Sequence, residues 1–133
     1  MKMHLLSRFL TAAAIASAIA VCAAQATPVA TRKELRRGDL AAAPGREAVS
    51  VLAEIPVGAA SSRHSHPGDD LGYVLEGTIV LQVDGQPPLT LHAGDVFTTP
   101  PGRVHNARNV GTTTARALDI YIIKKGQPAV IVP

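Results

Sequence analysis

The chain has 133 residues, among them 13 Lys or Arg, 10 Asp or Glu and 5 His. Residues 1–26 hold two of the basic residues and no acidic one, so the other 107 residues (133 minus 26) carry a net charge of about +1, which is 11 minus 10. A charge this close to zero argues against nucleic acid as a partner, because proteins that bind nucleic acid concentrate basic residues on one face. The remaining length suits a single domain.

Residues 1–26 have the three-part plan of a secretory signal peptide. A positively charged start is followed by the apolar run 9–21 and by small residues at positions 24 and 26. The apolar run is shorter than the ~20 residues that a membrane-spanning helix needs. A lipid anchor at Cys22 fits less well, because the residue before it is large. We predict cleavage after Ala26, export to the periplasm or the medium, and no membrane attachment of the mature chain.

Residues 27–47 form a polar leader that contains Pro and Gly and lacks a clear period. We predict that it lies over the domain that follows or over a neighbouring subunit. A barrel of ~100 residues buries only a modest fraction of its surface, and its edge strands need cover. We therefore predict a homodimer, in which residues 29–39 are a candidate to cover the partner's edge.

The strand pattern begins at residue 48, and we assign 48–133 to one β-domain. Seven short runs are separated by Gly and Pro: 48–55, 72–76, 78–83, 89–91, 95–99, 103–109 and 115–123. Asp84-Gly85 is typical of a tight hairpin in which both turn residues have positive φ. The last run alternates apolar residues at Leu118, Ile120 and Ile122. Short strands with regular punctuation predict an all-β sandwich or barrel.

Two clusters of side chains that can bind a metal lie in this domain. The first holds His64 and His66, with Asp70 four residues further on, and the second holds His105. Residues two apart in a strand point to the same face, so His64 and His66 can share one metal ion. Asp70 shares that face if the strand continues, and His105 must come from a strand folded back on the first. His92 lies outside both clusters and is interpreted as a surface residue.

The spacing of these residues closely resembles the two sequence motifs of the cupin family. The first motif matches at Gly58, His64, His66, Asp70 and Gly77. The second motif matches at Gly94, Pro100, Gly102, His105 and Asn109. The resemblance implies a double-stranded β-helix, or jelly-roll barrel, with a divalent metal ion such as Mn, Fe, Ni, Zn or Cu. It leaves the reaction open, because this scaffold hosts dioxygenases, isomerases, decarboxylases and storage proteins.

One motif position differs, since Asp70 stands where the family has glutamate. Aspartate is one methylene shorter, so its carboxylate reaches a metal only if the backbone comes closer. Asp70 could then bind the metal directly, bind it through water, or leave a site of three histidines. Asp69 is the adjacent alternative, but in a regular strand it faces away. We predict His64, His66, His105 and Asp70 as the metal ligands.

Tyr73 and Arg103 are the candidate substrate-binding residues. Tyr73 lies in a strand beside a ligand-bearing segment, and Arg103 shares the face of His105 if the strand is regular. No catalytic residue is assigned, although Asp69 and Glu76 are available as carboxylate bases. A site of three imidazoles and a carboxylate leaves two neighbouring positions of an octahedron open. It suits oxygenation or isomerisation of a small oxygen-rich molecule, and the alternative is a non-enzymatic module that binds a metal or a small ligand.

Overall fold

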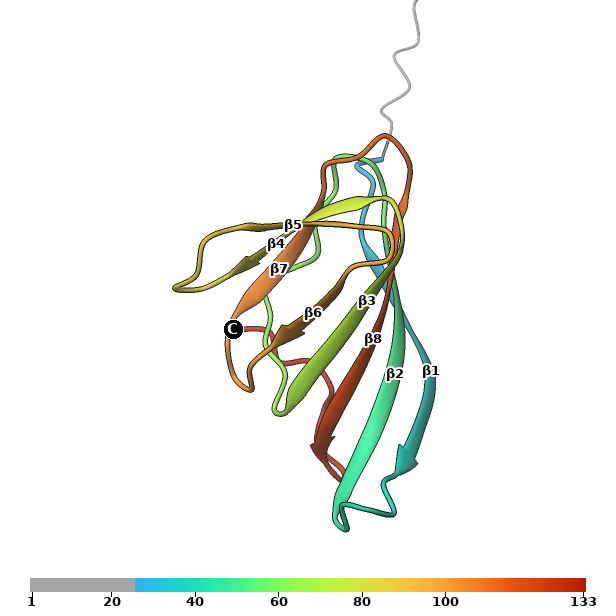
Figure 1. The fold of residues 1–133 in the computed structure, drawn as a ribbon, viewed down its shortest axis with the longest axis vertical. Coiled ribbons are helices and arrows are strands. Elements are labelled where there is room, and N and C mark those ends of the chain that lie inside the picture. Colours follow the sequence, from blue (N-terminus) through green and yellow to red (C-terminus); the bar gives the residue numbers. More distant parts are fainter. Residues whose placement is uncertain (1–25) are drawn as a thin grey trace, which may run out of the picture.

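The computed structural model describes residues 26–133, and every regular element in this range is a β-strand. The strands are β1 (Thr31–Asp39), β2 (Arg46–Ile55), β3 (Asp69–Glu76), β4 (Thr78–Val83), β5 (Leu89–His92), β6 (Val96–Thr99), β7 (His105–Asn109) and β8 (Ala115–Lys124). They form two antiparallel sheets, ordered β1-β2-β8-β3-β6 and β5-β4-β7, which face each other in Figure 1. The predicted all-β barrel is confirmed. The described residues contain no helix long and apolar enough to cross a membrane.

Apart from Ala26, the predicted signal peptide lies outside the described residues. The leader contains a strand that the sequence did not predict. Strand β1 pairs antiparallel with β2 of the same chain, from Thr31 opposite Glu54 to Asp39 opposite Glu47. Sequence periodicity missed it because its side chains are mostly polar and a register shift after Glu34 interrupts the alternation. The leader was predicted to lack regular structure. It instead adds an edge strand to the larger sheet of its own chain.

The inward face of strand β8 is not the face that carries most of its large aliphatic side chains. The buried, inward set is Ala115, Ala117, Asp119, Tyr121 and Ile123. The apolar set noted in the sequence, Leu118, Ile120 and Ile122, lies on the outer face of the sheet and is half-buried. Because β8 is the central strand, the small Ala115 and Ala117 and the short Asp119 on its inward face leave space between the two sheets.

The apolar core falls into two separate clusters of buried side chains. The larger cluster joins both sheets and includes Ile55, Ile79, Leu81 and Phe97. The smaller cluster consists of Val49, Val51, Tyr121 and Ile123. A cavity lined by members of both clusters lies between them. The candidate site described below occupies this cavity.

The Asp84-Gly85 turn differs from the predicted hairpin. Only Gly85 has a positive φ, 79°, and no residue other than glycine has one in the described part of the chain. The Gln86 N–H donates to the Val83 carbonyl at 3.0 Å, which closes a turn that needs a left-handed residue at its third position only. Two further prolines then delay the next strand, so β5 begins at Leu89.

Gly68 permits a close approach between two strands of the larger sheet. It lies directly before β3, and a Cβ atom at this position would collide with the backbone carbonyl of Ile122 in β8. The neighbour is backbone in a paired strand, so it cannot turn away as a side chain could. The absence of a side chain therefore fixes where β3 begins, and with it the position of Asp70.

We expect Gly68→Ala to lower the free energy of unfolding by about 1–3 kcal/mol, because an added methyl must part β3 from β8. Urea denaturation measures the change. Gly38→Ala in β1 is the matched control, since its Cβ would meet only the Arg36 Nε atom, at 3.9 Å. Equal denaturation midpoints for the two variants would contradict the proposed constraint.

Candidate metal centre

A direct backbone pairing brings the two histidine segments together. The His64 N–H donates to the His105 carbonyl at 3.0 Å, and the His105 N–H donates to the His64 carbonyl at 2.8 Å. His66 follows two residues after His64 on the same extended segment, and its carbonyl accepts the Gly102 N–H at 2.8 Å. The Pro-Pro-Gly turn before β7 therefore rests on the first histidine segment.

The three imidazoles are buried and converge. One nitrogen from each of His64, His66 and His105 lies within 4.8 Å of the others. The ring centroids are 4.4 Å apart for His64 and His105, 4.9 Å for His64 and His66, and 5.0 Å for His66 and His105. The three side chains can therefore hold one metal ion.

Hydrogen bonds to backbone carbonyls set the tautomer of each ring. The Nδ1 atoms lie 2.7 Å from the Ser62 carbonyl for His64, 2.6 Å from that of Ala129 for His66, and 2.9 Å from that of Arg103 for His105. A carbonyl oxygen only accepts, so each Nδ1 carries the proton and each Nε2 keeps a lone pair. Metal-binding histidines are usually held in this way.

Burial keeps the rings in the form that binds a metal. Desolvation lowers the pKa of His64 to about 3 and that of His66 to about 4. It also lowers the pKa of His105. All three imidazoles are consequently neutral near pH 7, and no proton has to be removed before a cation binds.

The carboxylate of Asp70 lies beside the histidines. Its Oδ2 atom is 3.8 Å from Nε2 of His66 and 3.8 Å from Nε2 of His105, which is too far for a hydrogen bond. Burial, with the neighbouring Asp119 second, raises the pKa of Asp70 to about 8. Asp69, the alternative weighed from the sequence, is exposed on the other face of β3.

Three buried polar atoms around this point have no hydrogen-bond partner among the described residues: His66 Nε2, Asp70 Oδ1 and Thr99 Oγ1. Asp70 and Thr99 are opposite each other in register, and the Thr99 hydroxyl lowers the pKa of Asp70, so these two groups act on each other. His66 Nε2 has no such neighbour, and because buried polar groups are nearly always satisfied, it indicates a polar occupant. Imidazole nitrogens with a carboxylate oxygen suit a divalent first-row metal. The residues present therefore fit a metal ion.

Sequence reasoning missed three side chains that line the same cavity. Asp119 points inward from β8 and is 7% exposed, and burial raises its pKa to about 7. Tyr121, two residues further on, stacks on the ring of His66 with centroids 3.9 Å apart. Arg32 reaches in from β1. A single acidic residue in the apolar run 115–123 was the available signal for Asp119.

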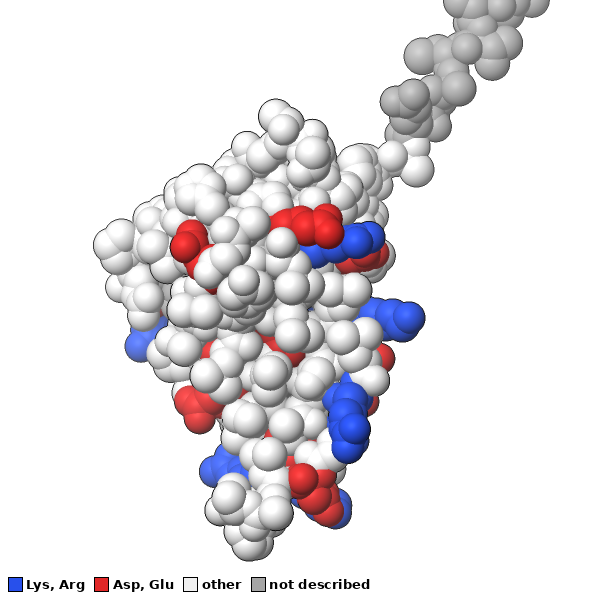
Figure 2. Space-filling model, turned by 45° about the vertical axis from the view of Figure 1, so that its right-hand side comes forward, with Lys and Arg blue, Asp and Glu red and all other residues white. Residues whose placement is uncertain are grey.

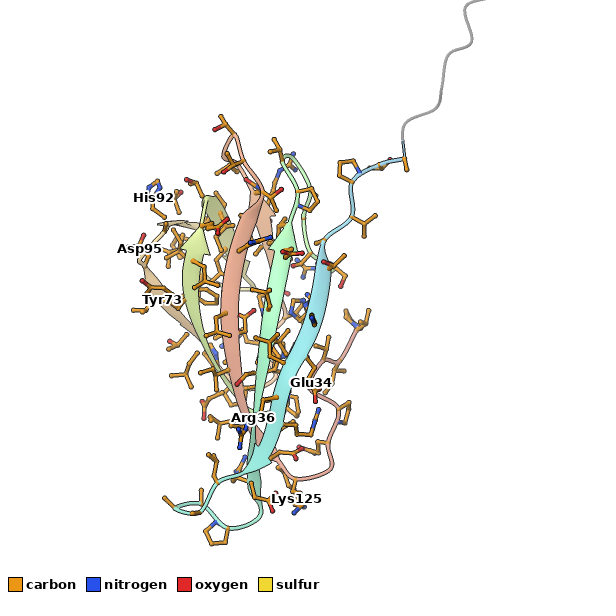
Figure 3. All side chains as sticks on the ribbon, turned by 90° about the vertical axis from the view of Figure 1, so that its right-hand side faces the viewer. Glu34, Arg36, Tyr73, His92, Asp95 and Lys125 are labelled. Carbon is orange, nitrogen blue, oxygen red and sulfur yellow. The ribbon has the colours of Figure 1, made fainter. Side chains whose placement is uncertain are left out.

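The two predicted substrate-binding residues do not line the cavity. Tyr73 is 43% exposed on the outer face of β3, where the alternation that turns Asp70 inward turns Tyr73 outward. It can be followed at the margin of the sheet in Figure 3. Arg103 precedes β7, so strand alternation does not apply to it, and its Nη1 donates to the Asp84 carbonyl at 3.2 Å. The carboxylate bases considered, Asp69 and Glu76, are exposed as well.

The sequence and the fold were compared with known proteins. A family model described as a cupin domain matches residues 51–121. A double-stranded β-helix protein from Klebsiella pneumoniae has 20% identity and a TM-score of 0.65, covering 82% of this chain and 90% of that one. A cupin superfamily protein from Desulfitobacterium hafniense has 23% identity and a TM-score of 0.59, covering 71% and 78%.

An enzyme is also among the similar structures. A point mutant of oxalate decarboxylase from Bacillus subtilis has 23% identity and a TM-score of 0.58, covering 64% of this chain and 23% of that one. No match was found among curated proteins. At these identities the structural likenesses establish the fold alone.

The pKa values determine how stability depends on pH in the metal-free protein. The histidine pKa values are lowered, so from about pH 4 to 6.5 the unfolded chain binds protons that the folded protein excludes, and stability rises with pH. Asp70 and Asp119 have raised pKa values, so from about pH 4 to 8 the folded protein holds protons that the unfolded chain releases, and stability falls with pH. Below pH 6.5 the three histidines, which make stability rise with pH, outnumber the two aspartates, which make it fall. Above pH 6.5 only the aspartates still change the stability. We expect maximal stability near pH 6.5.

Urea unfolding with a chelator, from about pH 5 to 8.5, measures this profile. Each unbalanced proton changes the free energy of unfolding by about 1.4 kcal/mol per pH unit. Asp119→Asn should flatten the decline above pH 6.5, because it removes one of the two carboxyls that hold a proton in the folded protein. A wild-type stability that still rises from pH 6.5 to 8 would show that the aspartates are charged in the folded protein.

Proposed function

Because the chain belongs to the cupin family, we propose that it binds one divalent first-row metal ion through His64, His66 and His105 and holds a small oxygen-rich molecule at that ion. One observation carries the proposal. Each buried imidazole has its Nδ1 tied to a backbone carbonyl, and the buried Nε2 of His66 has no partner among the described residues. Three oriented imidazoles that converge at one point in a buried cavity have no simpler use than to bind a metal ion.

Asp70 is the proposed fourth ligand. Its Oδ2 atom faces Nε2 of both His66 and His105 at 3.8 Å. A carboxylate there adds a hard oxygen ligand and a negative charge that partly offsets the charge of the ion. When bound, the ion supplies a Lewis acid with coordination positions left for a small ligand.

Asp119 is the proposed acid–base group, in place of the exposed Asp69 and Glu76. It is buried in the cavity wall, and its raised pKa of about 7 lets its carboxyl hold or release a proton near neutral pH. Glu76 instead lies 3.7 Å from Arg116 in an exposed ion pair. An inward carboxyl beside the metal ligands favours oxygenase-like or isomerase-like chemistry on a small substrate.

A binding module without turnover is the second candidate function. The cavity measures about 40 Å³, which is room for a metal ion with a few waters or a molecule of very few atoms. Oxygen uptake and product analysis with metal-loaded protein, over a panel of small diols and enols, support an enzyme. Ligand-induced thermal stabilisation without any product supports the binding module.

Export is part of this proposal. Residues 1–26 combine a basic start, an apolar run and small residues before the proposed cleavage point. The protein would then fill its site outside the cytosol, in the periplasm or the medium, where affinity order favours copper and zinc. The N-terminal sequence of the exported protein, expected to begin at Thr27, checks this point.

We also propose a homodimer that forms through the outer face of the larger sheet. Apolar side chains lie there in adjacent registers: Leu71 opposite Ile120, and Tyr73 opposite both Leu118 and Val96. Leu71 is 46% exposed and Val96 is 73% exposed. Figure 2 shows a broad area without charge between charged side chains that lie mostly toward the margins. Contiguous apolar area of this kind marks an interface, and a second copy meets it with equally apolar residues.

The metal proposal is tested by removing two ligands together. We expect His64→Ala/His105→Ala to lose metal, from about one equivalent per chain to roughly a tenth or less, because a single imidazole and a carboxylate bind weakly. Elemental analysis measures the metal, and circular dichroism checks that the strands remain. His92→Ala is the matched control, since His92 is exposed at the end of β5 and should leave the metal content unchanged. Full metal content in the double variant would overturn the assignment.

The dimer is tested at its most exposed apolar pair. Light scattering at about 10 μM should give twice the mass of one chain for the wild type and the mass of one chain for Tyr73→Lys/Val96→Lys, because charges facing each other across a dry interface are costly. Val110→Lys is the control, since Val110 is 50% exposed but lies outside this face. A wild type that is monomeric at this concentration would refute the dimer.

A further inference from the structure

We propose that Arg32 binds the carboxylate of the molecule held at the metal centre, so that the ligand of this site is a small carboxylate. The inference rests on the proposed function, because it requires a metal ion beside Arg32. It names the class of ligand and a residue that selects it. The substrate-binding role that the sequence suggested for Arg103 passes to a residue of the leader.

Pairing between β1 and β2 points Arg32 into the cavity. Arg32 is opposite Ala53, which lines the same cavity, whereas its neighbours Thr31 and Lys33 are opposite residues of the outer face. Arg32 is the only Lys or Arg among the described residues that line the cavity. Arg32 is an exposed residue whose Nη2 atom nevertheless reaches the ring of the buried His64, so its side chain runs from the surface to the site, where an entering ligand would meet it.

The guanidinium leaves the metal-binding lone pair of His64 free. Nη2 of Arg32 is 3.0 Å from Nδ1 and 3.1 Å from Nε2 of His64. A hydrogen bond in the plane of the ring would bring it close to one of these nitrogens and leave the other much farther away. The nearly equal distances place Nη2 over the face of the ring, so Arg32 and a metal ion can occupy the site together.

The guanidinium of Arg32 has N–H donors available for a ligand. A guanidinium carries five N–H donors in a planar fork that fits a carboxylate. Within residues 26–133 no carboxylate lies within ion-pair distance of Arg32, whereas Arg37 pairs with Glu34 and Glu47. Its charge nevertheless acts across the cavity, because it opposes the rise in the pKa of Asp70 and of Asp119.

Electrostatics then determines the sign of the charge on the ligand. A divalent ion and a guanidinium repel each other, and the repulsion grows where water is excluded. A carboxylate between them relieves it, with one oxygen toward the ion and charge-assisted hydrogen bonds from Arg32. A neutral amide of the same shape lacks this attraction. The cavity volume of about 40 Å³ suits a carboxylate group with a few further heavy atoms.

The experiment uses the full chain loaded with Co²⁺, whose visible absorption reports both metal binding and the entry of a new ligand. Acetate is the probe, and acetamide is its neutral counterpart. Wild type, Arg32→Gln, Arg32→Lys and Arg36→Gln are compared at one pH. Arg36 is the matched control, because it lies on the same strand opposite Ser50, on the outer face that Figure 3 views.

We expect acetate, but not acetamide, to change the Co²⁺ spectrum of the wild type. Arg32→Gln should weaken acetate binding at least tenfold, since hydrogen bonds between charged groups are lost, while Co²⁺ affinity stays equal or rises. Arg32→Lys should fall between wild type and Arg32→Gln, because the charge remains and the fork is lost. Arg36→Gln should match the wild type.

Each contrary outcome has a separate meaning. Acetate affinity that falls less than tenfold in Arg32→Gln, or no acetate binding by Co²⁺-loaded wild type, overturns the inference and leaves the metal site standing. Weaker Co²⁺ binding by Arg32→Gln assigns Arg32 to holding His64 in place, which also overturns it. No Co²⁺ binding by the wild type overturns the metal site and the inference with it.

Discussion

Hydrogen bonds from three imidazole Nδ1 atoms to backbone carbonyls are the constraint on which the rest of this structure depends. The carbonyls belong to three different segments, at Ser62, Arg103 and Ala129. The loop before the first histidine, the turn before β7 and the segment after β8 must therefore all be placed before the site exists. The backbone of Ser65 and Ile131 pairs in both directions at 2.9 Å, and the C-terminal end lies beside the start of β7 (Figure 1). The C-terminal segment therefore packs against the segment that carries His64 and His66.

This constraint determines where apolar and polar residues go. A conventional core would turn the apolar set of β8 inward, but that would fill the space the histidines need. Instead Ala117 and Asp119 point in, and the core divides into two clusters on either side of the cavity. The apolar set faces outward, which leaves a sheet face that a second copy can cover. The polar interior and the proposed interface thus both follow from the way in which β8 orients its two faces.

Much of the fold was predictable because its causes are local. Gly and Pro punctuation located β2 to β8 to within a few residues, and the two motifs gave the cupin fold. Strand β1 was missed since its polar side chains carry no periodic signal, and only its pairing with β2 makes it a strand. For β8, the alternation predicted a strand with two faces, and only the packing of the two sheets decides which face is inward.

The sequence by itself determined that His64 and His66 share a face, that His105 belongs to a second motif at the right spacing, and that Asp70 is shorter than the usual glutamate. These features depend on strand period and motif spacing, which are written along the chain. The tertiary structure alone decided that Arg32 and Asp119 join the same cavity and that Tyr73 and Arg103 do not. It also decided the protonation of the cavity, because burial shifts the pKa values of the histidines and of both aspartates. Pairing register and burial are relations between distant segments, and no local pattern specifies them.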